Sequence, residues 1–212
     1  IASAAGCLPL GPAFPAAAGT RLSLTPRPHA PIRHPRLRDF TLMVLPDTQY
    51  YTQQPDDPDN PYYLQAQWIV DNQQALNIPM VLHMGDVTHT NVTSEWLIAD
   101  AAHTILENAG VPYSIVPGNH DYPRENGGLE RDTGLYNTFF GPGRFAGEPW
   151  YGGSFGSTND SNCILFEVGP MRFMVVNLEF APRKEALCWA NEVIGAHPDR
   201  RVIVVTHCYQ ER

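Results

Sequence analysis

The sequence predicts an α/β domain, and three of its features lead to that class. Apolar runs of roughly six residues, typical of buried strands, recur along the chain. Segments whose apolar residues return at helical spacing follow several of these runs. Most runs end in polar residues that begin a loop. Repeated strand–loop–helix units of this kind indicate βαβ connections and a largely parallel sheet.

The first half of the chain repeats this unit. Residues Phe40–Leu45 form an apolar run that predicts a buried strand, and the polar stretch Pro46–Gln49 follows as a loop. A helix is predicted over residues 62–76, because their apolar side chains return at near-helical spacing. The same patterns predict a strand over 79–84, a helix that begins at Ser94 and Glu95 and stops at Gly110, and a strand over 111–116.

The second half departs from the repeat. Residues 122–162 contain nine glycines in 41 residues, and an interruption of that length is usually functional or only partly ordered. Two apolar runs then flank Gly169-Pro170, which predicts a β-hairpin over residues 162–167 and 172–178. A helix from Arg183 to about Ala196 and a last strand over 201–206, which ends at His207, complete the pattern.

The composition separates a leader, residues 1–38, from a domain that spans residues 39–212. The leader holds seven prolines and eight alanines without sustained periodicity. Small residues before Cys7 resemble the tail of a secretory signal, which predicts a protein that is secreted or held in the cell envelope. An Ala/Pro-rich tail on a cytoplasmic protein is the alternative. The chain stops just after the last strand, so we expect a domain that is incomplete at its C-terminus.

Charge and cysteine content exclude several functions. The formal net charge is -8, which argues against a nucleic-acid-binding protein that relies on phosphate attraction. No apolar run approaches the roughly 20 residues of a transmembrane helix. Four cysteines without a C-x-x-C pair argue against a structural zinc knot. A Cys163–Cys188 disulfide fits an exported protein, but the sequence leaves both the pairing and the oligomeric state open.

Polar residues that can bind metal follow four of the predicted strands. In open α/β sheets, ligands collect outside the carboxyl ends of the strands. Gly85 and Gly118 permit tight turns there. Carboxylate, amide and imidazole ligands together suit Mn, Fe or Zn, and one carboxylate can bridge two ions. The predicted metal ligands are Asp47 and Gln49, Asp86, Asn119, and His207.

The pair His120–Asp121 follows the ligand Asn119 directly. From this position His120 can protonate the leaving oxygen of a phosphate ester or stabilise its charged phosphoryl group. Asp121 is predicted to hold the imidazole in the orientation that this task requires.

These residues resemble the calcineurin-like metallophosphoesterase superfamily, to which purple acid phosphatase-like enzymes belong. The resemblance rests on Asp-x-Gln, Gly-Asp, Gly-Asn-His-Asp and a later His after a valine-rich strand, and covers residues 40–209. It implies an αββα sandwich of two mixed sheets flanked by helices. It also implies two divalent or trivalent ions, the first held by Asp47, Gln49 and Asp86 and the second by Asp86, Asn119 and His207. His120 takes the place of the catalytic histidine.

Two departures from the family pattern bear on function. Gln49 stands where the family usually has His, and its amide oxygen is a harder and weaker donor. The family's closing Gly-His-x-His motif does not follow His207 within this sequence, so each ion would be short of one histidine. We expect that the motif was cut off rather than lost. A non-catalytic scaffold with the same fold is the alternative.

The predicted function is hydrolysis of a small phosphate ester by in-line attack of a dimetal-bound hydroxide. A cyclic-nucleotide or phospholipid phosphodiesterase is a second possibility. Three arginines of the glycine-rich segment can grip a substrate phosphate or form a solvated loop face: Arg124, Arg131 and Arg144. His83 and His103 are predicted to be structural, and His89 to be a loop residue or a hydrogen-bond partner of the site.

Overall fold

The computed structural model describes residues 39–125 and 128–208 of the chain. The leader predicted for residues 1–38 lies outside the described residues. The elements in chain order are β1 (Leu42–Leu45), α1 (Pro61–Asn72), β2 (Met80–His83), α2 (Thr93–Asn108), β3 (Tyr113–Ile115), the 3-10 helix η1 (Asn119–Asp121), β4 (Arg124–Glu125), β5 (Gly128–Leu129), α3 (Gly134–Phe140), α4 (Pro142–Phe145), β6 (Tyr151–Ser154), β7 (Asn162–Val168), β8 (Met171–Leu178), α5 (Lys184–Ala196) and β9 (Arg201–Thr206).

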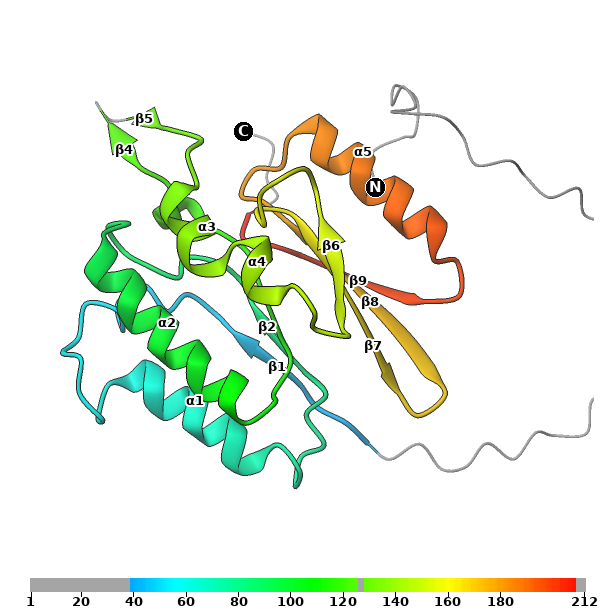
Figure 1. Ribbon diagram of the computed structural model, residues 1–212, viewed down its shortest axis with the longest axis horizontal. Helices are drawn as coiled ribbons and strands as arrows, with labels where there is room; N and C mark the ends of the chain where they lie inside the picture. The colour runs from blue at the N-terminus through cyan, green and yellow to red at the C-terminus, as the bar shows by residue number, and fades with distance from the viewer. Residues whose placement is uncertain (1–38, 126–127, 209–212) are drawn as a thin grey trace, which may run out of the picture. The chain divides into compact units, whose positions relative to one another are not determined.

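Two sheets form the centre of the domain (Figure 1). The first has the order β1-β2-β3 and is parallel throughout, as the strand–helix repeat predicts. The second has the order β6-β7-β8-β9, in which only the β8–β9 pair is parallel. The predicted hairpin is β7–β8, and Gly169 in its turn has a φ of 55°. A two-stranded ribbon, β4–β5, lies apart from both sheets.

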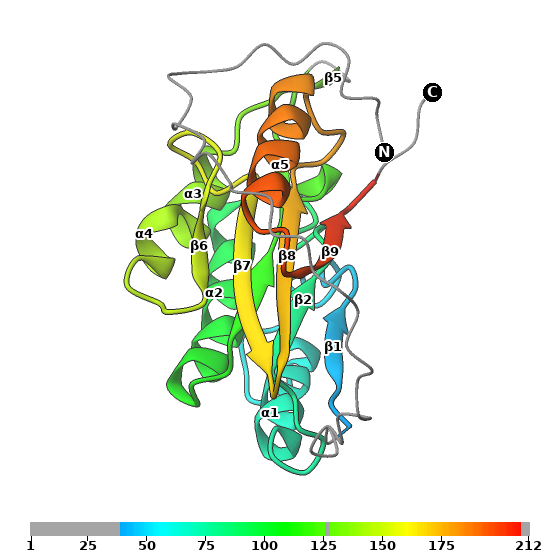
Figure 2. The same cartoon turned by 90° about the vertical axis from the view of Figure 1, so that its right-hand side faces the viewer.

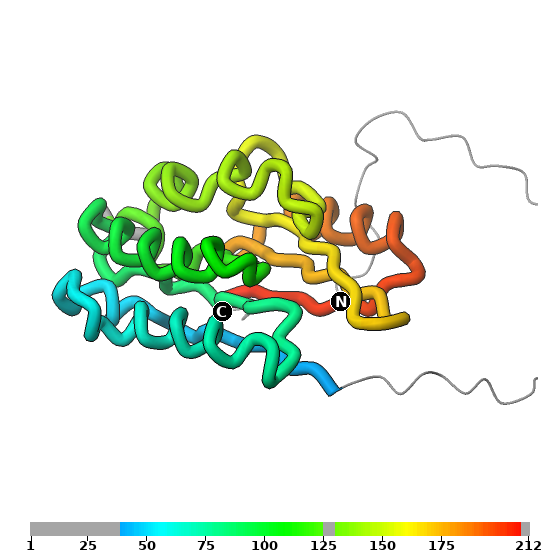
Figure 3. The backbone as a smooth tube through the Cα atoms, turned by 60° about the horizontal axis from the view of Figure 1, so that its bottom comes forward, coloured from blue at the N-terminus to red at the C-terminus, as the bar shows by residue number. Residues whose placement is uncertain are grey.

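Helices cover the outer faces of the two sheets, which gives the predicted αββα arrangement. Figure 2 looks onto α5, with the second sheet behind it and α1 and α2 at the rear. Figure 3 shows the same layers from another side. Three apolar clusters fill the spaces between them: one between α1, α2 and the first sheet, one between the sheets, and one under α5. The fold class predicted from the sequence is therefore confirmed.

Local sequence explains where the first helix begins and ends. The side-chain oxygen of Asn60 accepts a hydrogen bond from the Tyr62 amide at 2.9 Å, and Pro61 occupies the first turn, where its missing N–H costs nothing. The helix ends at Asn72 instead of the predicted Leu76. Residues 73–77 continue as turns that finish at Asn77, whose φ of 48° does not continue a helix.

The glycine-rich segment 122–162 is folded over its described part. It contains α3, α4 and β6, and side chains tie it to the core. The Tyr136 hydroxyl donates to the carbonyl of Ile115 on β3 at 3.1 Å, and within the segment the Asn159 amide donates to the carbonyl of Phe140 at 2.8 Å. The segment is ordered over its described residues and supplies β6, the edge strand of the second sheet. Partial order, one of the two options that the sequence left open, does not apply to these residues.

The Cys163–Cys188 disulfide, one pairing that the sequence left open, is not formed. Cys163 is a free, buried thiol on β7. Its sulfur packs against β6, so closely that a Cβ added at Gly152 would lie 2.6 Å from it. The thiol therefore lies beside β6, and burial raises its pKa to about 11.

None of the helices within residues 39–125 and 128–208 combines the length and the apolar character needed to cross a bilayer.

Two buried histidines, His83 on β2 and His103 on α2, have structural roles as predicted. His83 accepts a hydrogen bond from the Gly85 amide at 3.2 Å and contacts the Thr48 hydroxyl at 3.0 Å through its other nitrogen. His103 donates to the carbonyl of Ala99 at 3.0 Å and packs among aromatic rings. Burial lowers the pKa of both side chains, that of His103 from 6.5 to about 3.

We expect His103 to weaken the fold on acidification. Between pH 6.5 and about 3, the unfolded chain binds a proton at His103 that the folded chain does not bind. The contribution of His103 to the free energy of unfolding is therefore fully present above about pH 6.5. It falls by up to about 1.4 kcal/mol per pH unit below that value. Replacing His103 by Phe keeps an aromatic ring and removes the titration, so urea unfolding should show a shallower pH slope. Parallel slopes for the two proteins would contradict this account.

Candidate metal centre

The carboxyl ends of three strands from both sheets meet at one edge of the domain. Asp47 follows β1, Asp86 follows β2, and His207 follows β9 directly. One potential ligand atom from each of these residues lies within 4.8 Å of the others. The structure thus brings together three of the five metal ligands predicted from the sequence. We call Asp47, Asp86 and His207 the acidic cluster.

Turn conformation explains the glycine at position 85, and close backbone contact explains the glycine at position 118. Gly85 has a φ of 95° and Asp86 a φ of 49°, so the Gly-Asp turn needs left-handed backbone. Gly118 is extended, with a φ of -96°, and needs no such freedom. A Cβ on Gly118 would instead lie 2.1 Å from the amide nitrogen of Asp86. Glycine is required there because the two loops touch.

The imidazole of His207 is oriented by a main-chain carbonyl. Its Nδ1 donates to the carbonyl of Met84 at 3.0 Å, and its Nε2 lies 3.3 Å from a carboxylate oxygen of Asp86. Burial disfavours the charged forms of both Asp86 and His207. The contact between them nevertheless keeps the pKa of Asp86 below its ordinary value and raises the pKa of His207. Asp47 is half exposed and lies 3.7 Å from His207.

The acidic cluster fits a metal cation. Two carboxylates and an imidazole are donors that Mn, Fe and Zn accept. A histidine ligand usually donates its other ring nitrogen to a carbonyl or carboxylate, as His207 does to Met84. Asp86 is 3% exposed, and a second carboxylate beside it is costly unless a positive charge balances the pair. The donor set and its burial therefore suit a bound ion.

Gln49 approaches the cluster, but with its amide nitrogen. Its Nε2 lies 3.5 Å from Asp86, while its Oε1 is 2.9 Å from Nδ1 of His89. Ligation through Oε1, as predicted from the sequence, therefore requires a half-turn of this amide. His89, which the sequence left as a bystander or a hydrogen-bond partner, is a hydrogen-bond partner.

Asn119 begins η1, directly beside the cluster. Its side chain is half-buried and makes no hydrogen bond with another described residue. The next amide, that of His120, donates to the carboxylate of Asp86 at 2.8 Å, which holds η1 against the Gly-Asp loop. The amide oxygen of Asn119 is thus available for a ligand.

His120 is oriented by His89 and not by Asp121. Nδ1 of His120 donates to the carbonyl of His89 at 2.7 Å, and the two rings stack with centroids 4.9 Å apart. Nε2 makes no hydrogen bond with another described residue, so it is the nitrogen that can exchange a proton. No sequence motif marks a main-chain carbonyl in this role.

Asp121 holds two loops together, and its predicted contact with His120 is wrong. Its carboxylate is fully buried and accepts hydrogen bonds from the amides of Gly118, Val87 and Thr88 and from the Thr88 hydroxyl, all between 2.8 and 3.0 Å. Burial raises its pKa to about 6, against the opposing effect of these amides. The hydrogen bonds that this carboxylate accepts join the Gly-Asp loop to the Gly-Asn-His-Asp loop.

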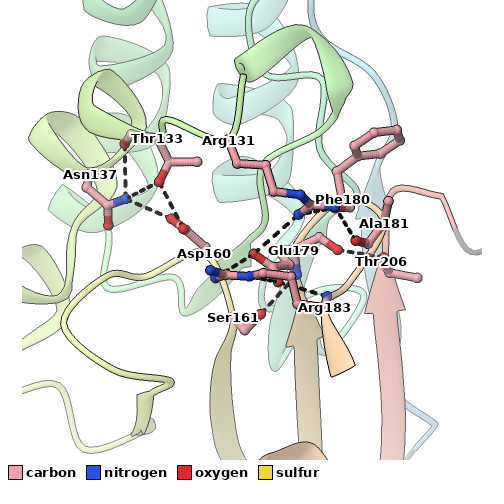
Figure 4. Close-up of polar contacts among 10 residues, drawn as sticks. All are labelled: Arg131, Thr133, Asn137, Asp160, Ser161, Glu179, Phe180, Ala181, Arg183 and Thr206. Carbon is pink, nitrogen blue, oxygen red and sulfur yellow. Dashed lines mark hydrogen bonds and ion pairs between the residues drawn. The ribbon is translucent and has the colours of Figure 1, made fainter. Parts of the chain in front are cut away.

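The arginines of the glycine-rich segment separate into different roles. Arg144 forms ion pairs with Asp100 and Glu107, and its guanidinium lies over the ring of Phe140, so it is not available to a substrate phosphate. Arg124 is exposed on β4. Arg131 donates to the carbonyl of Ala181 at 2.7 Å, close to the segment that follows β8 (Figure 4).

Replacing Gly118 by Ala should displace Asp86 and abolish metal binding, because the new methyl group would overlap the backbone of Asp86. Calorimetric titration with Mn²⁺ measures the loss, and circular dichroism reports whether the fold survives. Gly143→Ala in α4 is the matched control, since a Cβ there meets nothing within 4 Å. A Gly118→Ala protein that binds Mn²⁺ as tightly as the original would contradict the contact.

Replacing Asp121 by Asn tests whether this carboxylate holds the two loops together or orients the imidazole of His120. The new amide nitrogen would face a buried N–H donor, so we expect the free energy of unfolding to fall by about 2 kcal/mol. Urea denaturation measures it, with the exposed Asp199→Asn as the control. Unchanged stability would show that the carboxylate does not hold the loops.

The chain is similar to several known proteins. The calcineurin-like phosphoesterase family matches residues 40–211. The uncharacterised protein YvnB of Bacillus subtilis (strain 168) is 31% identical over 171 residues. That alignment covers 80% of this chain and 13% of the relative, so the chain spans a small part of that protein.

Two solved structures are similar in backbone. One is a dimetal phosphatase from Danio rerio, with a TM-score of 0.47 and 15% identity over 80% of this chain and 69% of that one. The other is the purple acid phosphatase PPD1 from yellow lupin (Lupinus luteus) seeds, with a TM-score of 0.49 and 15% identity over 78% and 29%. From the match over residues 40–211, the chain belongs to the calcineurin-like phosphoesterase family, whose members are metal-dependent phosphoesterases.

Proposed function

We propose that this chain hydrolyses a phosphate ester at the acidic cluster. The observation that carries the proposal is the convergence of Asp47, Asp86 and His207 within 4.8 Å, beside a histidine whose amide is bonded to Asp86. Metal-ligating groups and a proton-transfer group therefore occupy one edge of the domain. This is the combination that in-line displacement at phosphorus uses.

Two metal ions are the proposed cofactors, with Mn, Fe or Zn as candidates. Asp47, Gln49 and Asp86 would hold one, and Asp86, Asn119 and His207 the other. Bound at this edge, the ions would supply electrophilic catalysis and activate a water molecule. Asp86 suits the shared position, because one of its oxygens faces both Gln49 of the first set and His207 of the second, while the other accepts from the His120 amide.

His120 is the proposed general acid. Its Nδ1 is held by the carbonyl of His89, so Nε2 is the atom from which a proton would pass to the leaving oxygen. Stacking on His89 fixes the plane of the ring. His89 would serve as a positioning residue, since it contacts both His120 and Gln49.

His120→Ala should lower kcat by about 100-fold or more while the protein keeps its bound metal, because general-acid catalysis is lost and no proposed ligand is removed. Hydrolysis of 4-nitrophenyl phosphate and bis(4-nitrophenyl) phosphate gives the rates and separates monoester from diester chemistry. Metal analysis of the same preparations gives the occupancy. Chelation should abolish turnover of the original protein, and Mn²⁺ should restore it.

His197→Ala is the matched control. His197 also donates Nδ1 to a main-chain carbonyl, that of Val193, but it precedes the start of β9, whereas His207 follows the opposite end of that strand. Unchanged turnover in His120→Ala would remove His120 from the mechanism. A metal-loaded original protein that hydrolyses neither ester would favour the scaffold alternative.

A further inference from the structure

A buried carboxylate in the first turn of α2 holds the loop that carries His89. The carboxylate is that of Glu95, a residue that is 5% exposed. It accepts hydrogen bonds from the amides of His89 and Thr90, at 3.0 and 2.7 Å, and from the Thr90 hydroxyl at 2.9 Å. Glu95 therefore fixes two consecutive residues of the loop that follows the Gly-Asp turn.

These contacts differ from those of an ordinary helix cap. In a capping box, the glutamate at the third helical position bonds to the amide of the N-cap residue, which in α2 is Val92. Glu95 is the third residue of α2, but its carboxylate reaches past Val92 to the amides of Thr90 and His89. A helix start alone does not require contacts this far back, so they indicate a second role for the side chain.

Trp96, the next residue of α2, holds the same loop. Its side chain is fully buried, and the indole N–H donates to the side-chain oxygen of Asn91 at 2.8 Å. Asn91 has a φ of 53°, a left-handed conformation that asparagine tolerates better than most residues and that turns the chain into α2. The first turn of α2 therefore fixes the main chain of residues 89–91.

One peptide group joins this carboxylate to the imidazole of His120. The carbonyl of His89 and the amide of Thr90 belong to the same peptide group, and in a planar trans peptide the C=O and the N–H point in opposite directions. The N–H donates to Glu95 at 2.7 Å. The carbonyl accepts from Nδ1 of His120 at 2.7 Å. Glu95 and His120 thus bond to opposite sides of a single peptide group.

Two hydrogen bonds in series through one peptide group strengthen each other. The negative charge of Glu95 polarises the group and makes the carbonyl of His89 a stronger acceptor for Nδ1 of His120. Among the described residues, no lysine or arginine forms an ion pair with Glu95, so the N–H and O–H groups of the loop meet its charge. In a Ser-His-Asp triad the carboxylate contacts the imidazole directly, whereas here a peptide group stands between them.

We propose that Glu95 is the carboxylate that positions His120, acting through the peptide group between residues 89 and 90. The inference rests on the proposed function, in which His120 gives a proton to the leaving oxygen. Glu95 would fill the role that the sequence predicts for Asp121, whose carboxylate holds two loops instead. Because Nδ1 is committed to the carbonyl, Nε2 stays free to exchange a proton.

Glu95→Gln removes the charge and keeps the shape of the side chain. The amide oxygen of glutamine can accept from both main-chain amides, and its NH₂ group can donate to the Thr90 hydroxyl. The loop should therefore stay folded, as circular dichroism can verify, while the peptide group loses its polarisation. Glu185→Gln is the matched control, since Glu185 also lies in the first turn of a helix, α5, but is exposed.

The first measurement does not depend on turnover. Two-bond proton–nitrogen NMR spectra of the full chain at alkaline pH, with and without Zn²⁺, report which ring nitrogen of His120 carries the proton, and His120→Ala assigns the signals. Nδ1 should carry it in the original protein. In Glu95→Gln, the nitrogen shift of Nδ1 should move towards that of an unprotonated nitrogen, because a weaker acceptor holds the proton. A proton on Nε2 in the original protein, or an Nδ1 shift that is the same in Glu95→Gln, overturns the proposal.

The second measurement is the dependence of kcat on the leaving group. Phenol needs a proton to leave more than 4-nitrophenol does, so a poorly positioned acid affects phenyl phosphate more. In the metal-loaded protein, Glu95→Gln should lower kcat for phenyl phosphate about tenfold, with KM unchanged, and kcat for 4-nitrophenyl phosphate by less. Glu185→Gln should match the original protein on both esters. An equal loss on the two esters, or a change in KM alone, contradicts a role through His120.

Failure of the proposed function can be told apart from failure of this inference. If the metal-loaded chain hydrolyses neither ester, the nitrogen shift of Nδ1 still shows whether Glu95 acts on His120. A shift that moves in Glu95→Gln and not in Glu185→Gln then supports the positioning contact in a chain that is not a hydrolase. An active protein whose kcat for phenyl phosphate is the same in Glu95→Gln overturns the inference and leaves the proposed function in place.

Discussion

The buried carboxylate of Asp121 is the contact on which the rest of the site depends. Its oxygens accept from amides on two different loops, those of Val87 and Thr88 after β2 and that of Gly118 after β3. Because both loops are fixed to one group, Asp86 and His120 keep a constant separation, and the His120 amide can bond to Asp86. Four hydrogen bonds also offset the cost of burying this carboxylate.

A second contact joins the two sheets at the same edge. His207 follows a strand of the second sheet, and its Nδ1 donates to the carbonyl of Met84, which follows a strand of the first. The apolar layer between the sheets fixes how far apart they lie, so this contact sets where the imidazole meets Asp86. The acidic cluster is thus a product of sheet packing as much as of loop sequence.

The glycine-rich segment forms one side of a pocket of about 460 Å³. It contributes α3 and the loop after β6, which face Glu179 and Arg183 from the other side of the pocket. Asn137, Asn159 and Asp160 hold it together through hydrogen bonds within the segment. The proposed metal ligands all lie outside this segment.

The sequence by itself determined the alternation of strands with helices in the first half of the chain and the edge at which Asp47, Asp86 and His207 lie. Parallel strands deliver their carboxyl ends to one edge, so residues that follow apolar runs can be placed without coordinates. Only the tertiary structure decided the partner of Asp121, the direction of the Gln49 amide, and the pairing of Glu179 with Arg183. The physical reason for Asp121 is that its partners are mainly main-chain amides, whereas the contacts of Gln49 and Glu179 depend on how the segments pack together. Main-chain atoms are the same at every residue, so no pattern of side chains reveals which of them will meet.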